Sequence, residues 1–208
     1  ASSSELNGLL KLSRGLKNNS PRKVLNIHGG YFSILSAGTL GNNSMTGVAH
    51  GPEFGEYRAV VPVGGGIPIA RYYVPLLHAR IRYRDTLAIF RTKGWLNNSS
   101  AFHANVCDCP TCESTINKNI ENFVKFGEGN SKEVRRGRGI VRIEYPTRDT
   151  VMRCLQHYLQ RKDREYKFSS NCTKAEILGD LQKGVEEFEN VVGMDGVNHL
   201  KLWQHIFG

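Results

Sequence analysis

The sequence predicts a globular α/β fold in which helices alternate with parallel strands. Stretches with helical and with strand-like character follow one another through the first half of the chain. Several of the strand-like stretches end in glycine-rich loops, and α/β folds place their ligand sites in such loops. The composition, 39% hydrophobic and 23% charged over 208 residues, is typical of globular proteins and excludes a disordered or fibrous chain.

The first half of the chain supplies this alternation. Apolar residues at helical spacing predict helices over residues 5–16, 31–40 and 82–91. Short β-prone runs predict strands over residues 23–27, 45–50, 57–63 and 72–77.

Capping signals mark the helices of the second half. Thr147 is placed to cap a helix over residues 148–167. Residues 173–176 (TKAE) form a capping box before a second helix, which extends to about residue 192, and a third helix is expected over residues 197–207. A flexible basic loop and a strand precede these helices, at residues 133–139 and 139–145.

Positive charge is concentrated in the first 106 residues, which hold 12 Lys and Arg against 4 acids. The rest of the chain is nearly balanced, and the whole chain carries a formal charge of +9. Such a basic half favours a polyanionic partner, most often nucleic acid. A soluble surface with scattered basic residues is the alternative.

Two groups of arginines are candidates for contacts with nucleic acid. On a strand, Arg80, Arg82 and Arg84 would together face a sugar–phosphate backbone, whereas on a helix they would form a solvated face. Arg135 and Arg136 lie in a glycine-rich segment, where they suit either phosphate contact or a solvated linker.

The sequence also offers candidates for contact with a base. Gly64 and Gly65 would let a base or phosphate approach the backbone, or would form a tight turn. Tyr72 and Tyr73 would either stack on a base or belong to the core.

The clearest chemical signal is a cluster of cysteines. Cys107, Cys109 and Cys112 form a C-x-C-x-x-C turn, and three thiolates this close suit a Zn²⁺ ion, with a reactive thiol cluster as the alternative. The five cysteines do not have the even spread of a disulfide framework, so we expect a metal site in a reducing compartment and a cytoplasmic protein. The sequence contains no signal pattern and no apolar run long enough to span a membrane.

A tetrahedral metal site needs a fourth ligand. We expect His157, in the predicted helix over residues 148–167, to supply it. Cys154 ranks next because it shares a helix face with His157, and His103 lies too close to the cysteines to fold round to the ion. Four protein ligands close a zinc site and make it structural rather than catalytic.

This cysteine turn, followed by a histidine in a helix, resembles the zinc site of the tRNA-guanine transglycosylases. That superfamily includes the queuine and archaeosine enzymes and relatives that place 7-deazaguanines in DNA. The resemblance implies that Cys107, Cys109, Cys112 and His157 bind structural zinc. It covers about residues 45–165, with weaker similarities at residues 47–51, 74–80 and 92–97, and residues 122–145 would be an insertion.

The resemblance also implies a fold. The family has a (β/α)₈ barrel of the TIM type with its zinc site late in the chain, so this chain would hold the later part of such a barrel. The chain starts at Ala1 rather than Met, which is expected of a part of a longer protein. Three domains follow: an α/β barrel-like part over residues 1–100, a zinc-binding subdomain over residues 101–170 and C-terminal helices over residues 171–208.

The activity implied by the resemblance is the exchange of guanine in tRNA or DNA for a free 7-deazaguanine base. In the family, an Asp attacks the sugar carbon and a second carboxylate manages the proton. Residues 70–73, where this nucleophile would fall, contain no Asp, which leaves Glu56 and Asp85 as candidates. Gly47 and Gly51 are similar to a loop of the family that contacts the base.

Two other functions are consistent with the sequence. One is a non-catalytic accessory subunit that binds nucleic acid and works with a protein partner or as a homodimer. The other is a small zinc-stabilised protein in which the basic half has no role in nucleic-acid binding.

Overall fold

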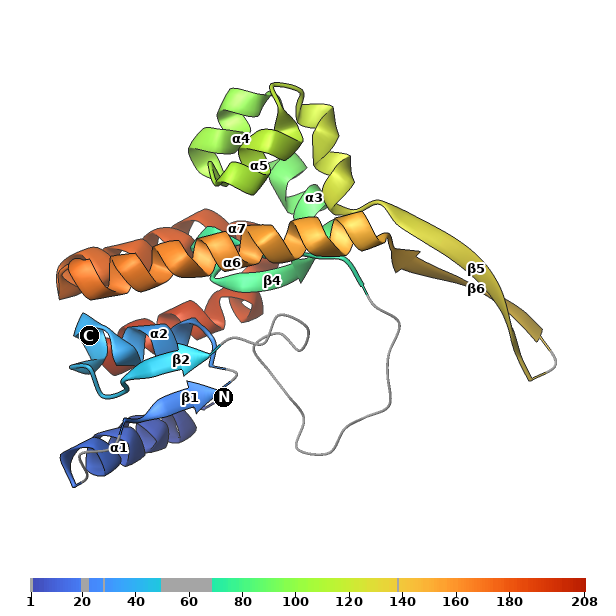
Figure 1. Ribbon diagram of the computed structural model, residues 1–208. Helices are drawn as coiled ribbons and strands as arrows, with labels where there is room; N and C mark the ends of the chain where they lie inside the picture. Colours follow the sequence, from blue (N-terminus) through green and yellow to red (C-terminus); the bar gives the residue numbers. More distant parts are fainter. Residues whose placement is uncertain (1, 20–22, 28, 50–68, 138) are drawn as a thin grey trace. The chain divides into compact units, whose positions relative to one another are not determined.

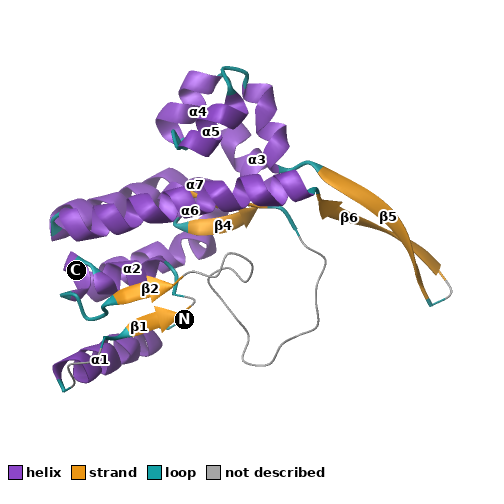
Figure 2. Cartoon of the chain, viewed as in Figure 1, coloured by secondary structure: helices purple, strands orange, loops and turns teal. Residues whose placement is uncertain are grey.

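The computed structural model describes residues 2–19, 23–27, 29–49, 69–137 and 139–208. It is a mixed α/β structure, 65% helical, with small sheets (Figures 1 and 2). The chain divides into two compact units, Ala1–Val61 with Lys162–Gly208 (unit 1) and Pro62–Arg161 (unit 2). The domain boundaries expected near residues 100 and 170 stay predictions.

Unit 1 consists of helices and two short parallel strands. Its elements are α1 (Ser3–Asn18), β1 (Leu25–Ile27), α2 (Tyr31–Ala37), the 3₁₀ turn η1 (Thr39–Gly41), β2 (Gly47–Ala49), the later part of α6 (Arg148–Asn171) and α7 (Lys174–Phe207). In the parallel pair, Leu25 lies opposite Gly47. The core of this unit buries large apolar side chains, among them those of Tyr31, Leu35 and Phe188.

Unit 2 contains the other strands and the candidate site. Its elements are β3 (Arg71–Val74), η2 (Pro75–Leu77), β4 (Ala79–Arg82), α3 (Tyr83–Thr92), α4 (Ser99–Asn105), α5 (Pro110–Ile116), η3 (Ile120–Phe126), β5 (Gly129–Arg136), β6 (Gly139–Pro146) and the first part of α6. Tyr72 lies at the centre of its aromatic core, edge-on to Phe90, Phe123 and Phe126 at centroid distances of 5.9, 5.4 and 5.1 Å. Tyr72 and Tyr73 are completely buried and therefore belong to the core.

The helices of the second half confirm the capping signals. Thr173 and Glu176 form the expected capping box at the start of α7. Thr147 caps α6, since its Oγ1 accepts a hydrogen bond from the backbone N–H of Thr150 at 3.1 Å. A kink at Gly193 divides α7, close to the expected break between its two helical segments.

The strands differ from the parallel arrangement expected. Among the described residues, only β1 and β2 are parallel, while β3–β4 and β5–β6 are antiparallel pairs. The chain reverses after β3 because Pro75 begins a 3₁₀ turn that ends at His78 in a left-handed conformation, so the strand expected over residues 72–77 stops at Val74. No closed barrel is present in the described part of the chain, and the expected TIM-type fold is not confirmed. The strand expected over residues 57–63 lies outside the described residues.

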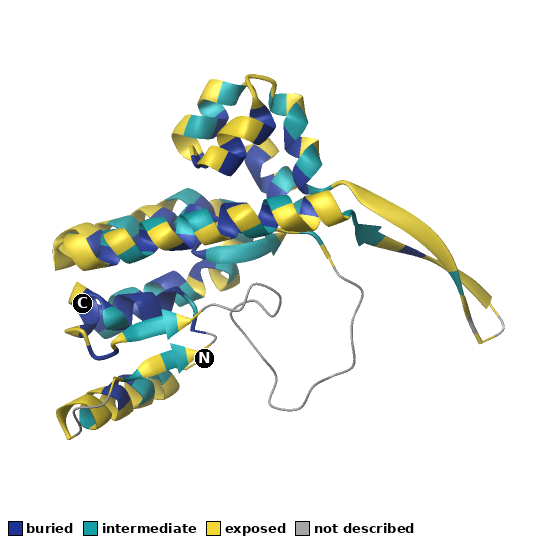
Figure 3. Cartoon of the chain, viewed as in Figure 1, coloured by how far each residue is buried: buried dark blue, intermediate teal, exposed yellow. Residues whose placement is uncertain are grey.

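The flexible loop expected over residues 133–139 was wrong. Residues 133–136 and Gly139 belong to a β-hairpin in which β5 and β6 pair from Gly129 opposite Pro146 to Arg136 opposite Gly139. Pairing satisfies the backbone groups along the inner edge of each strand. The basic, glycine-rich composition of this segment did not indicate this pairing. We call this hairpin the ribbon, and Figure 3 shows that it is exposed over much of its length.

Within the described residues, every helix is too short or too polar to cross a membrane.

Candidate metal centre

Four buried side chains of unit 2 converge on one point. The Sγ atoms of Cys107, Cys109 and Cys112 and a ring nitrogen of His157 all lie within 4.8 Å of one another. The Nδ1 atom of His157 is 3.7, 3.3 and 3.3 Å from these three sulfur atoms, in the same order. The predicted set of four ligands is therefore brought together, close enough to hold a metal ion.

Local structure brings the cysteines together. Cys109 is the N-cap of α5, and Pro110 occupies the first helical position, where a proline ring fits without loss of a hydrogen bond. The backbone N–H of Cys109 donates to Cys107 Sγ at 3.4 Å, which closes the turn. The backbone N–H of Thr111 donates to Gln160 Oε1 at 3.1 Å and so ties the start of α5 to α6.

A hydrogen bond on the far side of the ring orients His157. Its Nε2 lies 2.7 Å from the backbone oxygen of Tyr73, which can only accept, so Nε2 carries a proton, and Nδ1 faces the sulfurs with a lone pair when the ring is neutral, as it is in a metal ligand. Histidines that bind metals are held in this way, with the second nitrogen donating to a carbonyl or carboxylate.

The distances fit a tetrahedral ion. With Zn–S bonds of about 2.3 Å and a Zn–N bond of about 2.05 Å, tetrahedral geometry separates sulfur and nitrogen by about 3.6 Å. The observed sulfur–nitrogen distances of 3.3 to 3.7 Å bracket this value. The donor set suits zinc chemically, although other ions that prefer thiolates share its geometry.

Tyr72 supports the cluster from β3. Its ring stacks on that of His157 with centroids 4.2 Å apart and planes 15° apart. Its hydroxyl lies 3.2 Å from Cys112 Sγ. Burial, followed by the neighbouring Cys112, raises the pKa of Tyr72 well above its usual value, so the hydroxyl stays protonated and can donate to the sulfur when Cys112 is a metal-bound thiolate.

The electrostatics of the cluster call for a cation. Burial lowers the pKa of His157, but contacts with Cys107 and Cys109 outweigh this and raise it to about 9. Contacts with Cys107 and Cys112 lower the pKa of Cys109, whereas burial and contacts with Cys107 and Cys109 raise that of Cys112 well above its usual value. The thiols thus compete to ionise in one buried space, and a bound cation would let all of them ionise together.

The two other candidate ligands lie outside the cluster. Cys154 is buried, but its Sγ donates to the backbone oxygen of Phe126 at 3.4 Å, and burial raises its pKa to about 12. It therefore remains a neutral thiol, unlike a metal ligand. His103 places its Nδ1 2.9 Å from the backbone oxygen of Cys107, where it supports the turn instead of entering the site.

The proposed catalytic carboxylates do not form a site among the described residues. Asp85 is an exposed residue in the first turn of α3. Glu56, Gly51, Gly64 and Gly65 lie outside the described residues. Gly47 is in β2 of unit 1.

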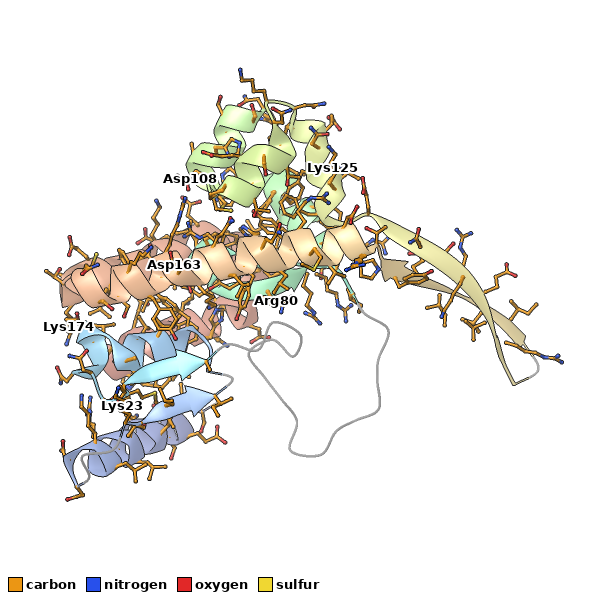
Figure 4. The ribbon with its side chains drawn as sticks, viewed as in Figure 1. Lys23, Arg80, Asp108, Lys125, Asp163 and Lys174 are labelled. Atoms are coloured by element: carbon orange, nitrogen blue, oxygen red, sulfur yellow. The ribbon has the colours of Figure 1, made fainter. Side chains whose placement is uncertain are left out.

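The arginine candidates have separate environments. The expectation that Arg80, Arg82 and Arg84 share one element was wrong, because β4 ends at Arg82 and α3 begins at Tyr83. Arg80, labelled in Figure 4, lies over the ring of Tyr158 at 5.0 Å from its centroid. Arg135 and Arg136 lie at the end of β5.

Sequence reasoning missed the residues that surround the ligands. The hydroxyl of Tyr72 contacts Cys112 and the backbone oxygen of Tyr73 contacts His157 from 40 and 84 positions along the chain, and Gln160 bonds Thr111 of the cysteine turn across 49 positions. No spacing rule connects them to the cysteines.

Comparison with protein-family models, with curated proteins and with solved structures found no match for this chain.

Proposed function

We propose that Cys107, Cys109, Cys112 and His157 hold a structural Zn²⁺ ion. Thiolates and imidazole are ligands that zinc prefers, and the four of them are buried at distances that suit a tetrahedral ion. A full set of protein ligands leaves no position for a water molecule or a substrate. The ion would supply a cross-link between the α5 turn and α6 and would neutralise the thiolates.

We further propose that the chain is a zinc-stabilised, nucleic-acid-binding subunit without catalysis of its own. The closed ligand set carries the zinc-stabilised part of this proposal, because it assigns the metal to the fold instead of to a reaction. The excess of basic residues in the first 106 positions supports a polyanionic partner. The absence of an Asp at residues 70–73 supports an accessory role.

Binding of labelled tRNA and duplex DNA at several salt concentrations tests this function. Each phosphate that the protein neutralises should contribute about −0.7 (single strand) to −0.9 (duplex) to the slope of log K against log salt. We therefore expect binding that weakens steeply with salt. Failure to bind any nucleic acid at moderate salt, with zinc bound and the fold intact, would leave a zinc-stabilised protein with no such role.

Guanine exchange is the second candidate function. The elements that carry the ligands favour it, because three cysteines lie in one turn and the histidine lies in a following helix. The resemblance to tRNA-guanine transglycosylases implies this arrangement. In this case the chain would be the later part of a TIM-type barrel, and Glu56 or Asp85 would supply the reacting carboxylate.

Incorporation of labelled guanine into tRNA or DNA by the zinc-loaded chain tests the second candidate. Incorporation would establish an enzyme, and its loss in Glu56→Gln or Asp85→Asn would identify the carboxylate. No incorporation into either polymer would reject catalysis by this chain alone.

A further inference from the structure

A hollow of about 300 Å³ lies at the base of the ribbon in unit 2. It is lined mainly by basic, aromatic and glycine residues, chiefly Arg82, Tyr83, Arg84, Gly127, Gly129 and Tyr145. Glu144 is the one acid among the described residues that line it. This volume is at the lower end of the roughly 300–1,000 Å³ of small-molecule pockets and suits a group of the size of one nucleotide.

The change from β4 to α3 places the candidate arginines on two elements, and it brings Arg82 and Arg84 to this hollow. Arg82 ends β4 and Arg84 lies in the first turn of α3, and both are exposed. A guanidinium presents a planar fork of donors that matches the oxygens of a phosphate. Two such groups at the mouth of one hollow favour an anionic ligand.

The two tyrosines that line the hollow differ in how tightly they are packed. The ring of Tyr83 packs on Phe123 with centroids 5.5 Å apart. It also occupies the space beside Gly127, where a Cβ would lie 2.0 Å from Tyr83 Cδ1. Tyr145 is partly exposed at the end of β6, so its ring is available for stacking.

The register of the ribbon gives its two faces different charges, because residues directly opposite each other share a face. On one face, Lys132 pairs with Ile143 and Val134 pairs with Val141. Tyr145 shares this face and also lines the hollow, while Gly129 and Glu144 line it from the opposite face. Lys132 Nζ lies 5.8 Å from the centroid of the Tyr145 ring. This face carries no acid between Asn130 and Tyr145, and we call it the acid-free face.

The opposite face of the ribbon is electrically balanced. Glu133 lies opposite Arg142, and Ser131 lies opposite Glu144. An anionic chain would therefore meet attraction along the acid-free face and mixed charge along the other. Figure 4 shows side chains that project from both faces of the ribbon.

We propose that the hollow and the acid-free face form one track for an unpaired segment of a polynucleotide. Arg82 and Arg84 hold phosphates at the hollow, Tyr145 stacks on an unpaired base, and Lys132 contacts the next part of the backbone. An unpaired base is required because the bases of a duplex are already stacked and offer no free face to a tyrosine. This inference rests on the proposed nucleic-acid binding and names the form of the nucleic acid and the residues that contact it.

Fluorescence anisotropy with labelled oligouridine, the matching deoxy-oligonucleotide and a duplex of equal length tests the track. We expect R82A/R84A to weaken binding to the single strands by about tenfold or more. The slope of log K against log salt should become shallower by about 1.4, which is two contacts at about 0.7 each. The control K11A/K183A removes the same charge from exposed sites on α1 and α7 of unit 1. It should change the affinity and the salt slope by less than R82A/R84A does.

A second pair of variants tests the choice of face. Lys132→Ala and Arg142→Ala each remove one exposed positive charge from the same ribbon, on opposite faces. We expect weaker binding only for Lys132→Ala. Tyr145→Leu keeps an apolar side chain and should weaken binding to single strands by about 5- to 100-fold if the ring stacks on a base.

The outcomes separate this inference from the proposed function. If the unaltered chain binds no nucleic acid, the proposed function and the track both fail. If it binds but R82A/R84A behaves like K11A/K183A, or if the two ribbon variants lose affinity equally, the track alone is overturned. Tighter binding of the duplex than of either single strand would also overturn it. Zinc content and circular dichroism of each variant check that the fold is retained.

Discussion

At the scale of the residue, the strongest prediction concerns the loss of the His157 side chain. It is completely buried, with Nδ1 toward three sulfur atoms and Nε2 held by the backbone of Tyr73. His157→Ala should abolish zinc binding and lower the free energy of unfolding by about 4 kcal/mol or more, because binding of a structural metal is part of the folding free energy. Elemental mass spectrometry and denaturant unfolding measure the two effects.

Cys154→Ala is the matched control for this change. Cys154 is also buried and lies three residues earlier on α6, but it is a protonated thiol outside the cluster. The variant should keep its zinc and lose about 1 kcal/mol, the worth of one modest hydrogen bond. Release of zinc from Cys154→Ala, with retention in His157→Ala, would show that the ligand assignment is wrong.

The hydroxyl of Tyr72 is predicted to strengthen metal binding. Tyr72→Phe removes the donor to Cys112 Sγ but keeps the ring that stacks on His157. Loss of such a supporting group should weaken metal affinity by about 10- to 100-fold without emptying the site. Competition with a chromophoric chelator measures the affinity, and Tyr83→Phe is the control. Equal affinities for the two variants would contradict the role given to Tyr72.

At the scale of the element, two glycines of α7 should respond oppositely to the same substitution. Gly193 has φ 75° and ψ 171°, a region that only glycine occupies readily, so Gly193→Ala should destabilise the protein by about 1–3 kcal/mol. Gly179 lies at an exposed position of α7 with open space around it, so Gly179→Ala should stabilise by about 0.5–1 kcal/mol. Thermal denaturation measures both, and changes of the same sign would contradict the kink.

The elements also show what the sequence could predict. Local signals succeeded: the capping box at Thr173, the cap at Thr147 and the turn of Cys107–Cys112 depend on residues within a few positions of one another. His157 was predicted although it lies far along the sequence from the cysteines, because a tetrahedral site with three ligands needs a fourth. The strand expected over residues 139–145 is present as β6, but β5 was missed, because it becomes a strand only by pairing with β6 and its own composition does not indicate that pairing.

At the scale of the whole molecule, the metal centre is predicted to govern the stability of unit 2. Its ligands contact Tyr72, whose ring lies at the centre of the aromatic core. Zinc removal should therefore expose this core, and tyrosine fluorescence and near-ultraviolet circular dichroism should change together with zinc loss. A strong chelator that removes the ion without either change would show that the fold does not depend on it.

The zinc content of the protein as purified, measured by elemental mass spectrometry without added metal, tests the central claim most directly. The account predicts one zinc ion per chain that survives dialysis and disappears in His157→Ala. A folded protein without zinc, or one that carries a different metal in the same four ligands, would contradict it.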